Sequence, residues 1–139
     1  MRIVFLNWFD WTHPLWGGAE VYLRETATRL AARGHDVTVL CSAYAGGAPV
    51  EQLDGVTVLR RGRFWTFSLE LPWHYRRLVG ERGGWDVVVE YTNKVPLFAP
   101  VWAGRPVVAV AHHLWGRAIF TESPLPIAAA VWASEALIP

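Results

Sequence analysis

Short apolar runs alternate with helix-like segments along this chain, and that alternation limits the folds open to it more than any other feature. The runs span residues 2–6, 36–40, 56–59, 86–90 and 106–111. Each is largely apolar throughout, which is typical of strands buried on both faces of a parallel sheet. Such strands with intervening helices predict a doubly wound sheet, and right-handed crossovers favour an order such as 3-2-1-4-5. The expected fold class is therefore α/β with a Rossmann-like parallel sheet.

Helical periodicity is clearest between the first two runs. Residues 19–33 place apolar side chains at helical spacing, and Gly34 fits a left-handed cap at the end of that helix. Pro72 is expected to be a break or a first-turn residue, so the second helix is predicted over about 73–82. The other connections are expected to be a loop at 43–54, a short crossover at 96–102 and a final helix at 124–137.

Charge and cysteine content exclude several classes of protein. The formal net charge is +1 and the pI about 8.0, so no broad basic surface is expected and nucleic-acid binding is not predicted. The basic cluster Arg60, Arg61 and Arg63 is interpreted as a solvated strand end. Cys41 is the single cysteine, which excludes an internal disulfide, and its place after an apolar run predicts a small buried side chain. A single buried cysteine without a disulfide fits a protein of a reducing compartment best.

Hydropathy sets two further limits. Hydrophobic residues make up 53% of the chain and charged residues 18%, which excludes a disordered chain and indicates apolar surface that another domain or partner covers. The run at 2–6 is too short for a signal peptide, and Pro124, Pro126 and Glu135 interrupt the apolar tail, so no membrane span is expected. A cytoplasmic protein is therefore predicted.

Gly17 and Gly18 come directly before the first predicted helix. The free N–H groups and the dipole at such a place form a site for an anion such as a phosphate, and glycine lets a ligand approach the backbone closely. A turn that requires glycine would explain the pair equally well. The loop of about ten residues before the helix does not match the tight dinucleotide-binding turn, and no P-loop lysine is present. Both interpretations stay open at this point.

His112 and His113 follow the fifth apolar run, at the carboxyl end of its predicted strand. Open parallel sheets bind ligands beyond the carboxyl ends of their strands, near the switch point between the first and fourth strands. Because neighbouring residues of a strand point to opposite sides, one of the two imidazoles is expected to face that crevice and to hydrogen-bond a hydroxyl or a phosphate. A packed, hydrogen-bonded histidine is the structural alternative. No set of zinc ligands accompanies the pair, and no metal site is predicted.

Four segments together resemble those of a known family. Gly17-Gly18-Ala19-Glu20 leads into the first helix, and residues 30–40 read Leu-Ala-Ala-Arg-Gly-His-Asp-Val-Thr-Val-Leu. The other two are residues 86–90, Asp-Val-Val-Val-Glu, and residues 106–113, which end in the two histidines. With these segments the chain resembles the N-terminal domain of the retaining family 4 glycosyltransferases, which have the two-domain GT-B fold. The resemblance covers essentially the whole chain.

The resemblance implies one half of an enzyme that transfers a sugar from a nucleotide sugar to an acceptor, with retained configuration and no required metal ion or cofactor. In the family the glycine-pair loop lies against the donor diphosphate, which here implies Gly17 and Gly18. A histidine after the fifth strand lies near the transferred sugar, which implies His112, or its neighbour His113, as the catalytic residue. The paired-glutamate donor motif belongs to a C-terminal domain. Residues 1–139 are therefore expected to be an acceptor-side domain, truncated at its C-terminal end and inactive alone.

Acceptor contacts are predicted in two places. Asp10, His13 and Trp16 lie in the loop after the first strand, where polar side chains and aromatic faces can bind sugars. Glu90 ends the fourth strand and is a further candidate, although an acid at a strand end also caps the following turn. A saccharide or a lipid-linked acceptor fits this loop. The apolar residues of this loop and of the C-terminal tail are compatible with a protein bound peripherally at the inner face of the membrane.

Two other functions remain as alternatives. A separate chain that carries the donor domain could dock on the apolar surface and complete a split glycosyltransferase. A Rossmann-like module that binds a nucleotide or a partner without catalysis is the alternative outside the enzymes. Tight nucleotide binding by the chain would favour that module, because the acceptor-side domain of the family binds a nucleotide weakly by itself.

Overall fold

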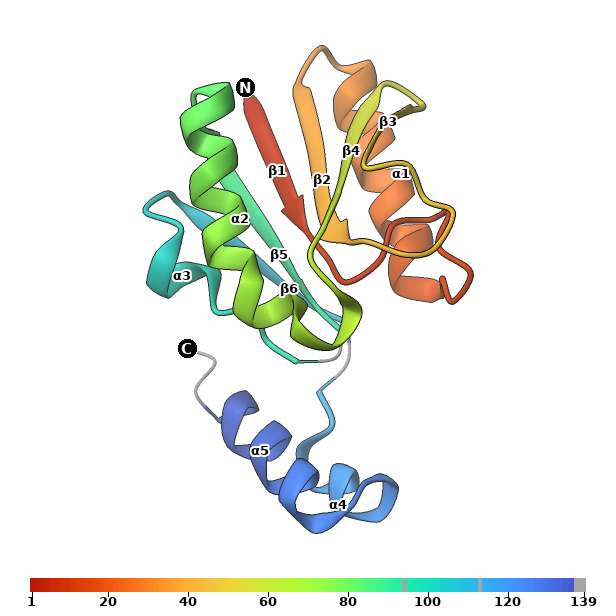
Figure 1. Ribbon diagram of the computed structural model, residues 1–139, viewed down its shortest axis with the longest axis vertical. Helices are drawn as coiled ribbons and strands as arrows, with labels where there is room; N and C mark the ends of the chain where they lie inside the picture. Colours follow the sequence, from red (N-terminus) through yellow and green to blue (C-terminus); the bar gives the residue numbers. More distant parts are fainter. Residues whose placement is uncertain (94, 113, 137–139) are drawn as a thin grey trace.

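A central sheet of six strands organises the computed structural model, which describes residues 1–93, 95–112 and 114–136 (Figure 1). The strand order is β3-β4-β2-β1-β5-β6, and every pairing is parallel except that of β3 with β4. The strands are β1 (Arg2–Leu6), β2 (Asp36–Ser42), β3 (Val50–Leu53), β4 (Val56–Arg61), β5 (Val87–Thr92) and β6 (Val107–Ala111). The five predicted strands and their order are confirmed, and so is the α/β, doubly wound fold.

Helices cover both faces of the sheet (Figure 1). α1 (Gly18–Ala32) packs on one face, and α2 (Phe67–Arg82) and α3 (Ala99–Trp102) pack on the other. The remaining helical elements are η1 (Phe64–Thr66), η2 (Gly116–Ala118), α4 (Ile119–Glu122) and α5 (Leu125–Glu135). The chain runs outward from β1 to β2 and β4, then returns to β5 and β6, so the topological switch point lies between β1 and β5.

The edge strand β3 was not predicted from the sequence, which indicated a loop over residues 43–54. β3 and β4 form an antiparallel hairpin whose turn is Asp54-Gly55. Both turn residues have positive φ, 51° at Asp54 and 82° at Gly55, as in the tight turns that suit the twist of a hairpin. An Asp-Gly pair between short strands is a recognisable hairpin signal, so the hairpin of β3 and β4 could have been predicted from the sequence.

The prediction for α2 was wrong at its start. The helix begins at Phe67 rather than near residue 73, and Pro72 lies inside it. Proline removes one backbone hydrogen bond of the helix. Leu71 and Tyr75 are buried one turn apart in the apolar core, and burying a side chain of this size contributes about 1.5–3 kcal/mol. Packing therefore outweighs the loss at the proline.

Each face of the sheet has its own apolar core. On one face, Leu71 and Leu78 of α2 pack in a cluster with residues of β1, β2, β4 and β5. On the other face, Leu23 and Ala27 of α1 belong to a second cluster, which also contains Cys41. Cys41 is fully buried and carries a free thiol, so its predicted place in the core is confirmed.

The last two helices extend beyond the carboxyl ends of the strands (Figure 1). The carboxylate of Glu135, at the end of α5, accepts hydrogen bonds from the backbone N–H groups of Trp115 and Gly116, each at 2.7 Å. These bonds tie α5 back to η2. The final helix, predicted over 124–137, spans Leu125–Glu135, and residue 137 lies outside the described residues. Within the described part of the chain, no helix is long and apolar enough to cross a membrane.

Candidate functional site

The carboxyl ends of β1, β5 and β6 lie side by side at the switch point. Asn7 follows β1 directly, Asn93 follows β5, and His112 follows β6. Because Thr92 of β5 is paired with Ala111 of β6, the next residues on each strand, Asn93 and His112, are neighbours across the sheet edge. The topology therefore gathers three polar side chains at one end of the sheet, where ligands of such folds bind.

Glu20, in the first turn of α1, connects these strand ends to the glycine pair. Its Oε1 accepts hydrogen bonds from the side-chain amides of Asn7 at 3.0 Å and Asn93 at 3.2 Å. Its Oε2 accepts the backbone N–H of Gly17 at 2.8 Å. The carboxylate is almost fully buried, and its charge lies at the positive end of the helix dipole. Glu20 thereby fixes the entry of α1 against the ends of β1 and β5.

The glycine pair leaves the N-terminus of α1 open. Gly17 is extended, with φ −148° and ψ −156°, and Gly18 is helical, so neither backbone needs the left-handed region. A Cβ added to Gly18 would meet no atom within 4 Å, and one on Gly17 would meet only Glu20 Oε2 at 3.7 Å. The turn itself therefore does not require glycine here. The first N–H groups of a helix have no partner inside it, so those of Gly18 and Ala19 are accessible to an external acceptor.

His112 lies against two tyrosines from different elements. Its ring centroid is 4.7 Å from that of Tyr91 on β5 and 5.4 Å from that of Tyr22 on α1. Burial lowers the pKa of the imidazole below its ordinary value, and the negative charge of Glu20 opposes this shift. His112 is therefore neutral at neutral pH, with one ring nitrogen able to donate a hydrogen bond and the other to accept one.

Two buried polar atoms at this edge have no hydrogen-bond partner among the described residues. They are Nε2 of His112 and the side-chain oxygen Oδ1 of Asn93. A buried polar atom without a hydrogen-bond partner lowers the stability of the fold by about 1–3 kcal/mol, so such atoms are expected to bind a ligand or a water molecule. They belong to neighbouring strand ends close to the open N-terminus of α1. His113, the second predicted catalytic residue, lies outside the described residues.

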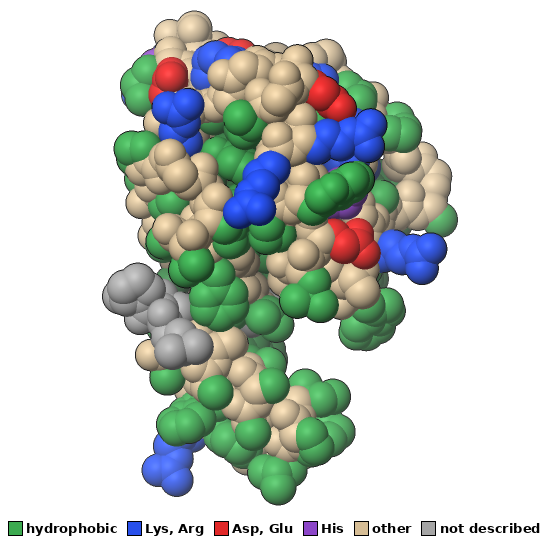
Figure 2. All heavy atoms as spheres, turned by 60° about the vertical axis from the view of Figure 1, so that its left-hand side comes forward, with side chains coloured by type: hydrophobic (Ala, Val, Ile, Leu, Met, Phe, Trp, Pro, Cys, Tyr) green, Lys and Arg blue, Asp and Glu red, His purple; other side chains and the backbone are tan. Residues whose placement is uncertain are grey.

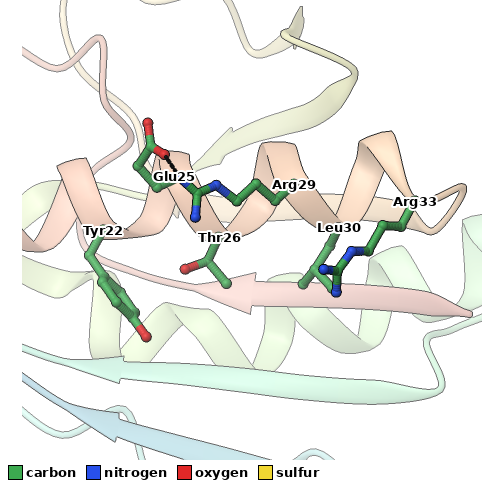
Figure 3. Close-up of a pocket in the computed structure, with 6 residues that line it drawn as sticks. All are labelled: Tyr22, Glu25, Thr26, Arg29, Leu30 and Arg33. Carbon is green, nitrogen blue, oxygen red and sulfur yellow. Dashed lines mark hydrogen bonds and ion pairs between the residues drawn. The ribbon is translucent and has the colours of Figure 1, made fainter.

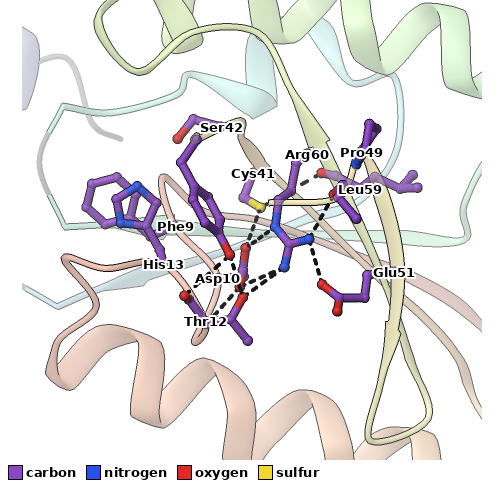
Figure 4. Close-up of polar contacts among 12 residues, drawn as sticks. Phe9, Asp10, Thr12, His13, Cys41, Ser42, Pro49, Glu51, Leu59 and Arg60 are labelled. Atoms are coloured by element: carbon purple, nitrogen blue, oxygen red, sulfur yellow. Dashed lines mark hydrogen bonds and ion pairs between the residues drawn. The ribbon is translucent and has the colours of Figure 1, made fainter. Parts of the chain in front are cut away.

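Asp10, a predicted acceptor contact, is instead part of a buried ion pair (Figure 4). Its Oδ2 is 2.7 Å from Nε of Arg60 and its Oδ1 is 3.2 Å from Nη2 of the same guanidinium, and both side chains are fully buried. Arg60 also donates to Glu51 at 2.8 Å and to the Ala48 carbonyl at 2.8 Å. The interpretation of Arg60 as part of a solvated strand end was therefore wrong, because two carboxylates and a carbonyl compensate its buried charge.

Both members of this pair remain ionised at neutral pH. Burial raises the pKa of the Asp10 carboxyl, but hydrogen bonds from Arg60 and Thr12 outweigh burial and lower the pKa overall. Burial lowers the pKa of Arg60, and its hydrogen bonds to Asp10 and Glu51 raise it above its ordinary value. Burial and the charge of Asp10 raise the pKa of the neighbouring Cys41 thiol, so that thiol stays protonated. The pair anchors the loop after β1 to β4.

His13 and Trp16, the other acceptor contacts predicted in this loop, differ in accessibility. His13 stacks on Phe9 with ring centroids 3.8 Å apart, and its Nδ1 accepts the backbone N–H of Leu15 at 3.0 Å. These contacts give His13 a packing role within the loop. Trp16 is 54% exposed immediately before Gly17, so its ring is available to a ligand.

Glu90, the remaining predicted acceptor contact, uses both carboxylate oxygens within the fold. Oε1 accepts the backbone N–H of Leu97 and Oε2 that of Ala99, each at 2.7 Å, and the side chain is buried. Ala99 is the first residue of α3, so Glu90 caps that helix. This geometry favours the capping role over contact with an acceptor.

Sequence reasoning missed Asn7, Glu20 and Asn93 as members of the site. Glu20 could have been found, because an acid at the third position of a helix often accepts the N–H of the cap residue. Asn7 and Asn93 each follow an apolar strand, but asparagine is common in loops, and only their shared contact with Glu20 distinguishes them.

A hollow of about 420 Å³ lies along the side of α1 (Figure 3). Tyr22, Thr26 and Leu30 line it, together with Arg33 and the ion pair of Glu25 with Arg29 at 2.8 Å. None of the predicted site residues lines this hollow. Among the residues that the structure describes, no group of three or more His, Cys, Asp or Glu side chains is placed to bind a metal ion.

Comparison with families of known proteins identifies a match for this chain. The sequence matches the family described as Glycosyltransferase Family 4 over residues 16–138. The matched region begins just before the glycine pair and includes α1, β2 to β6 and the C-terminal helices, which is most of the chain. A search of curated proteins found no match.

Proposed function

Because the chain belongs to glycosyltransferase family 4, we propose that it is the acceptor-side half of an enzyme that transfers a sugar from a nucleotide sugar to an acceptor. The family makes it a glycosyltransferase-type domain. One observation supports a transfer site at the switch point. The open N-terminus of α1 lies near the unpartnered atoms Nε2 of His112 and Oδ1 of Asn93.

In this proposal the donor diphosphate binds at the glycine pair. The N–H groups of Gly18 and Ala19 hydrogen-bond its oxygens, and the dipole of α1 favours its negative charge. Transfer breaks the bond between the anomeric carbon and a diphosphate oxygen and forms a bond from that carbon to an acceptor hydroxyl oxygen, while the hydroxyl proton is released. Negative charge then develops on the leaving diphosphate, which preorganised N–H groups stabilise.

His112 and Asn93 hold the transferred sugar in this scheme. A neutral imidazole can donate to or accept from a sugar hydroxyl, and an amide oxygen accepts from one. Both atoms are already buried without a partner, so a sugar hydroxyl would replace a missing interaction rather than compete with one. Trp16 offers an exposed ring on which an acceptor sugar can stack.

The proposal requires a second domain for the nucleotide and for the other half of the transition-state contacts, in the same chain or in another one. The described chain by itself is therefore expected to bind nucleotide sugars weakly, with a Kd near about 1 mM, and not to transfer sugar. A cytoplasmic location is part of the proposal, because that compartment supplies nucleotide sugars.

Calorimetric titration with nucleotide-diphosphate sugars tests the site when it compares two glycine variants. Gly18→Ala adds a methyl group at the open helix N-terminus, where it blocks the approach of a diphosphate without any clash in the free chain. Gly80→Ala is the matched control, because Gly80 also lies in a helix, α2, with no atom within 4 Å of the added Cβ. We expect Gly18→Ala to abolish measurable binding and Gly80→Ala to leave it unchanged.

The alternatives give different results in the same titration. Equal binding by both variants would contradict a diphosphate site at the glycine pair. Micromolar or tighter binding by the unmodified chain would favour a non-catalytic nucleotide-binding module over half of an enzyme.

A further inference from the structure

The outer face of α2 and the preceding turn carry large apolar side chains in contact with solvent. Trp65, Leu69 and Trp73 follow one another at intervals of four residues and are 87%, 81% and 59% exposed. Residues four apart lie on the same side of a helix, so the three side chains form one stripe. Their exposure contrasts with the buried inner face of α2, where Phe67, Leu71 and Tyr75 pack against the sheet. An exposed apolar stripe of this kind marks an interaction surface.

Positive charge is concentrated around this stripe. Residues 61–82 contain five arginines and two glutamates, a net charge of +3, whereas the whole chain carries +1 and the remaining residues therefore carry −2. The two glutamates are already engaged: Glu70 accepts from the Thr66 hydroxyl, and Glu81 is 2.8 Å from Nε of Arg77. Arginine and hydrophobic side chains lie intermingled on this side of the molecule (Figure 2). The stripe is thus flanked by cations.

A small hollow adjoins the stripe at Trp73. It measures about 210 Å³ and is lined by Arg61, Trp73, His74, Arg77, Leu78 and Glu81. The guanidinium of Arg77 also lies over the ring of Trp73, 5.7 Å from its centroid. Glu81 is paired with Arg77, so the two guanidinium groups leave the hollow with one uncompensated positive charge. A positive hollow beside an aromatic ring suits an anionic group that is attached to an apolar chain.

We propose that the outer face of α2 is a docking surface for a lipid bilayer that contains anionic lipids. Tryptophan prefers the interface between the lipid headgroups and the acyl chains, and arginines near an anionic surface add to the attraction. A second copy of the chain is a poorer occupant, because a symmetric contact would place two surfaces of charge +3 against each other.

The C-terminal helices present another apolar surface, but one without this charge. Phe120, Leu125 and Trp132 of α4 and α5 are all exposed, and Figure 2 shows mostly hydrophobic side chains on this part of the molecule. Residues 114–136 contain one arginine and two glutamates. Attraction to anionic lipids therefore distinguishes α2 from α4 and α5.

Sedimentation of the chain with lipid vesicles tests this proposal. The chain is expected to pellet with vesicles of equal parts phosphatidylcholine and phosphatidylglycerol, and not with phosphatidylcholine alone. Raising the salt from about 0.1 M to about 1 M shortens the screening length from about 10 Å to about 3 Å and should release it. Trp65→Ala combined with Trp73→Ala should weaken binding by at least about tenfold. Arg63→Gln and Arg76→Gln should each weaken it by about fivefold.

Trp132→Ala is the matched control, because it removes an exposed tryptophan from α5 and should leave binding unchanged. All of these side chains are exposed, so far-UV circular dichroism should be the same for every variant. The proposal is overturned if the double tryptophan variant binds as the unmodified chain does, if Trp132→Ala loses as much binding, or if phosphatidylcholine vesicles bind equally well. It is also overturned if vesicles do not bind and the double variant converts a dimer to a monomer in ultracentrifugation, since the surface would then belong to a second copy.

Discussion

Replacing Arg60 with methionine removes one charge from the fully buried ion pair that anchors the loop before the glycine pair. Methionine keeps the apolar stem of the side chain, so the change isolates the guanidinium. Asp10 loses its bonds to Nε and Nη2, at 2.7 Å and 3.2 Å, and Glu51 loses its bond at 2.8 Å. Asp10 is fully buried, so water cannot replace the hydrogen bonds that its carboxylate loses.

The expected loss of unfolding free energy is about 3–5 kcal/mol, the usual result of leaving one member of a buried pair uncompensated. For a chain of this length that loss corresponds to a melting temperature lower by roughly 10–20 °C. Urea unfolding followed by circular dichroism measures the free energy. Arg24→Met is the matched control, because Arg24 forms an ion pair with Asp54 at 2.9 Å in which both side chains are about half exposed. This variant should lose less than about 1 kcal/mol.

The pH dependence of the same variant gives an independent check. In the unmodified chain the pKa of Asp10 is lowered by its hydrogen bonds, so its contribution to stability is present above the ordinary carboxyl pKa and is lost as the pH falls through the folded value. In Arg60→Met burial remains and the main opposing bonds are gone, so the pKa of Asp10 rises above its ordinary value. Protonation of Asp10 in the variant then relieves the buried charge already above the ordinary carboxyl pKa of about 4, so the difference in stability between the two proteins should begin to shrink there as the pH falls. It should shrink further below about pH 4, where the unmodified chain loses the contribution of Asp10.

Two results would refute this reasoning. One is a loss in Arg60→Met no larger than that in Arg24→Met, which would mean that the pair is not buried in solution. The other is a difference between Arg60→Met and the unmodified chain that stays constant down to low pH, which would mean that Asp10 is not the group left without a partner.

Two further predictions concern the site and its support. The ring resonances of His112 should titrate with a pKa below the ordinary histidine value of 6.5, because burial lowers the pKa, and in Glu20→Gln the pKa should fall further, because the Glu20 carboxylate raises it. Stability should decline as the pH falls from 6.5 through the lowered pKa of His112. A pKa at or above 6.5 in the unmodified chain would contradict the burial of the imidazole. Glu90→Gln should lower the unfolding free energy by about 1–3 kcal/mol in urea, because an amide cannot accept both backbone N–H groups of Leu97 and Ala99, and unchanged stability would contradict the capping role.

The strand order was predictable because each parallel strand is a continuous apolar run. Such runs are short, buried on both faces and connected by right-handed crossovers, which leaves few arrangements. β3 has no such run, since Val50–Leu53 at the sheet edge alternates exposed and half-buried residues. The start of α2 was mistaken because Pro72 was given more weight than the spacing of Phe67, Leu71 and Tyr75.

The place of the candidate site was easier to predict than the residues that form it. The glycine pair and His112 could be proposed because a helix N-terminus and strand ends are recognisable from local sequence, and their binding of a ligand stays a prediction. Asp10 and Arg60 were misinterpreted because fifty residues separate them, and only the fold shows that each satisfies the charge of the other. Asn93 was overlooked for the same reason, since its role comes from a contact with Glu20 on another element.

In the proposed function the glycine pair binds the diphosphate of a nucleotide sugar and the ends of β5 and β6 hold its sugar, and backbone amide NMR can test this assignment residue by residue. Inorganic pyrophosphate and then a nucleoside-diphosphate sugar would be titrated into the isotope-labelled chain. We expect the largest shifts at Gly18 and Ala19 with pyrophosphate, and at Asn93 and His112 as well with the nucleotide sugar. Shifts confined to arginines elsewhere, such as Arg29 and Arg33 on the side of α1, would contradict it.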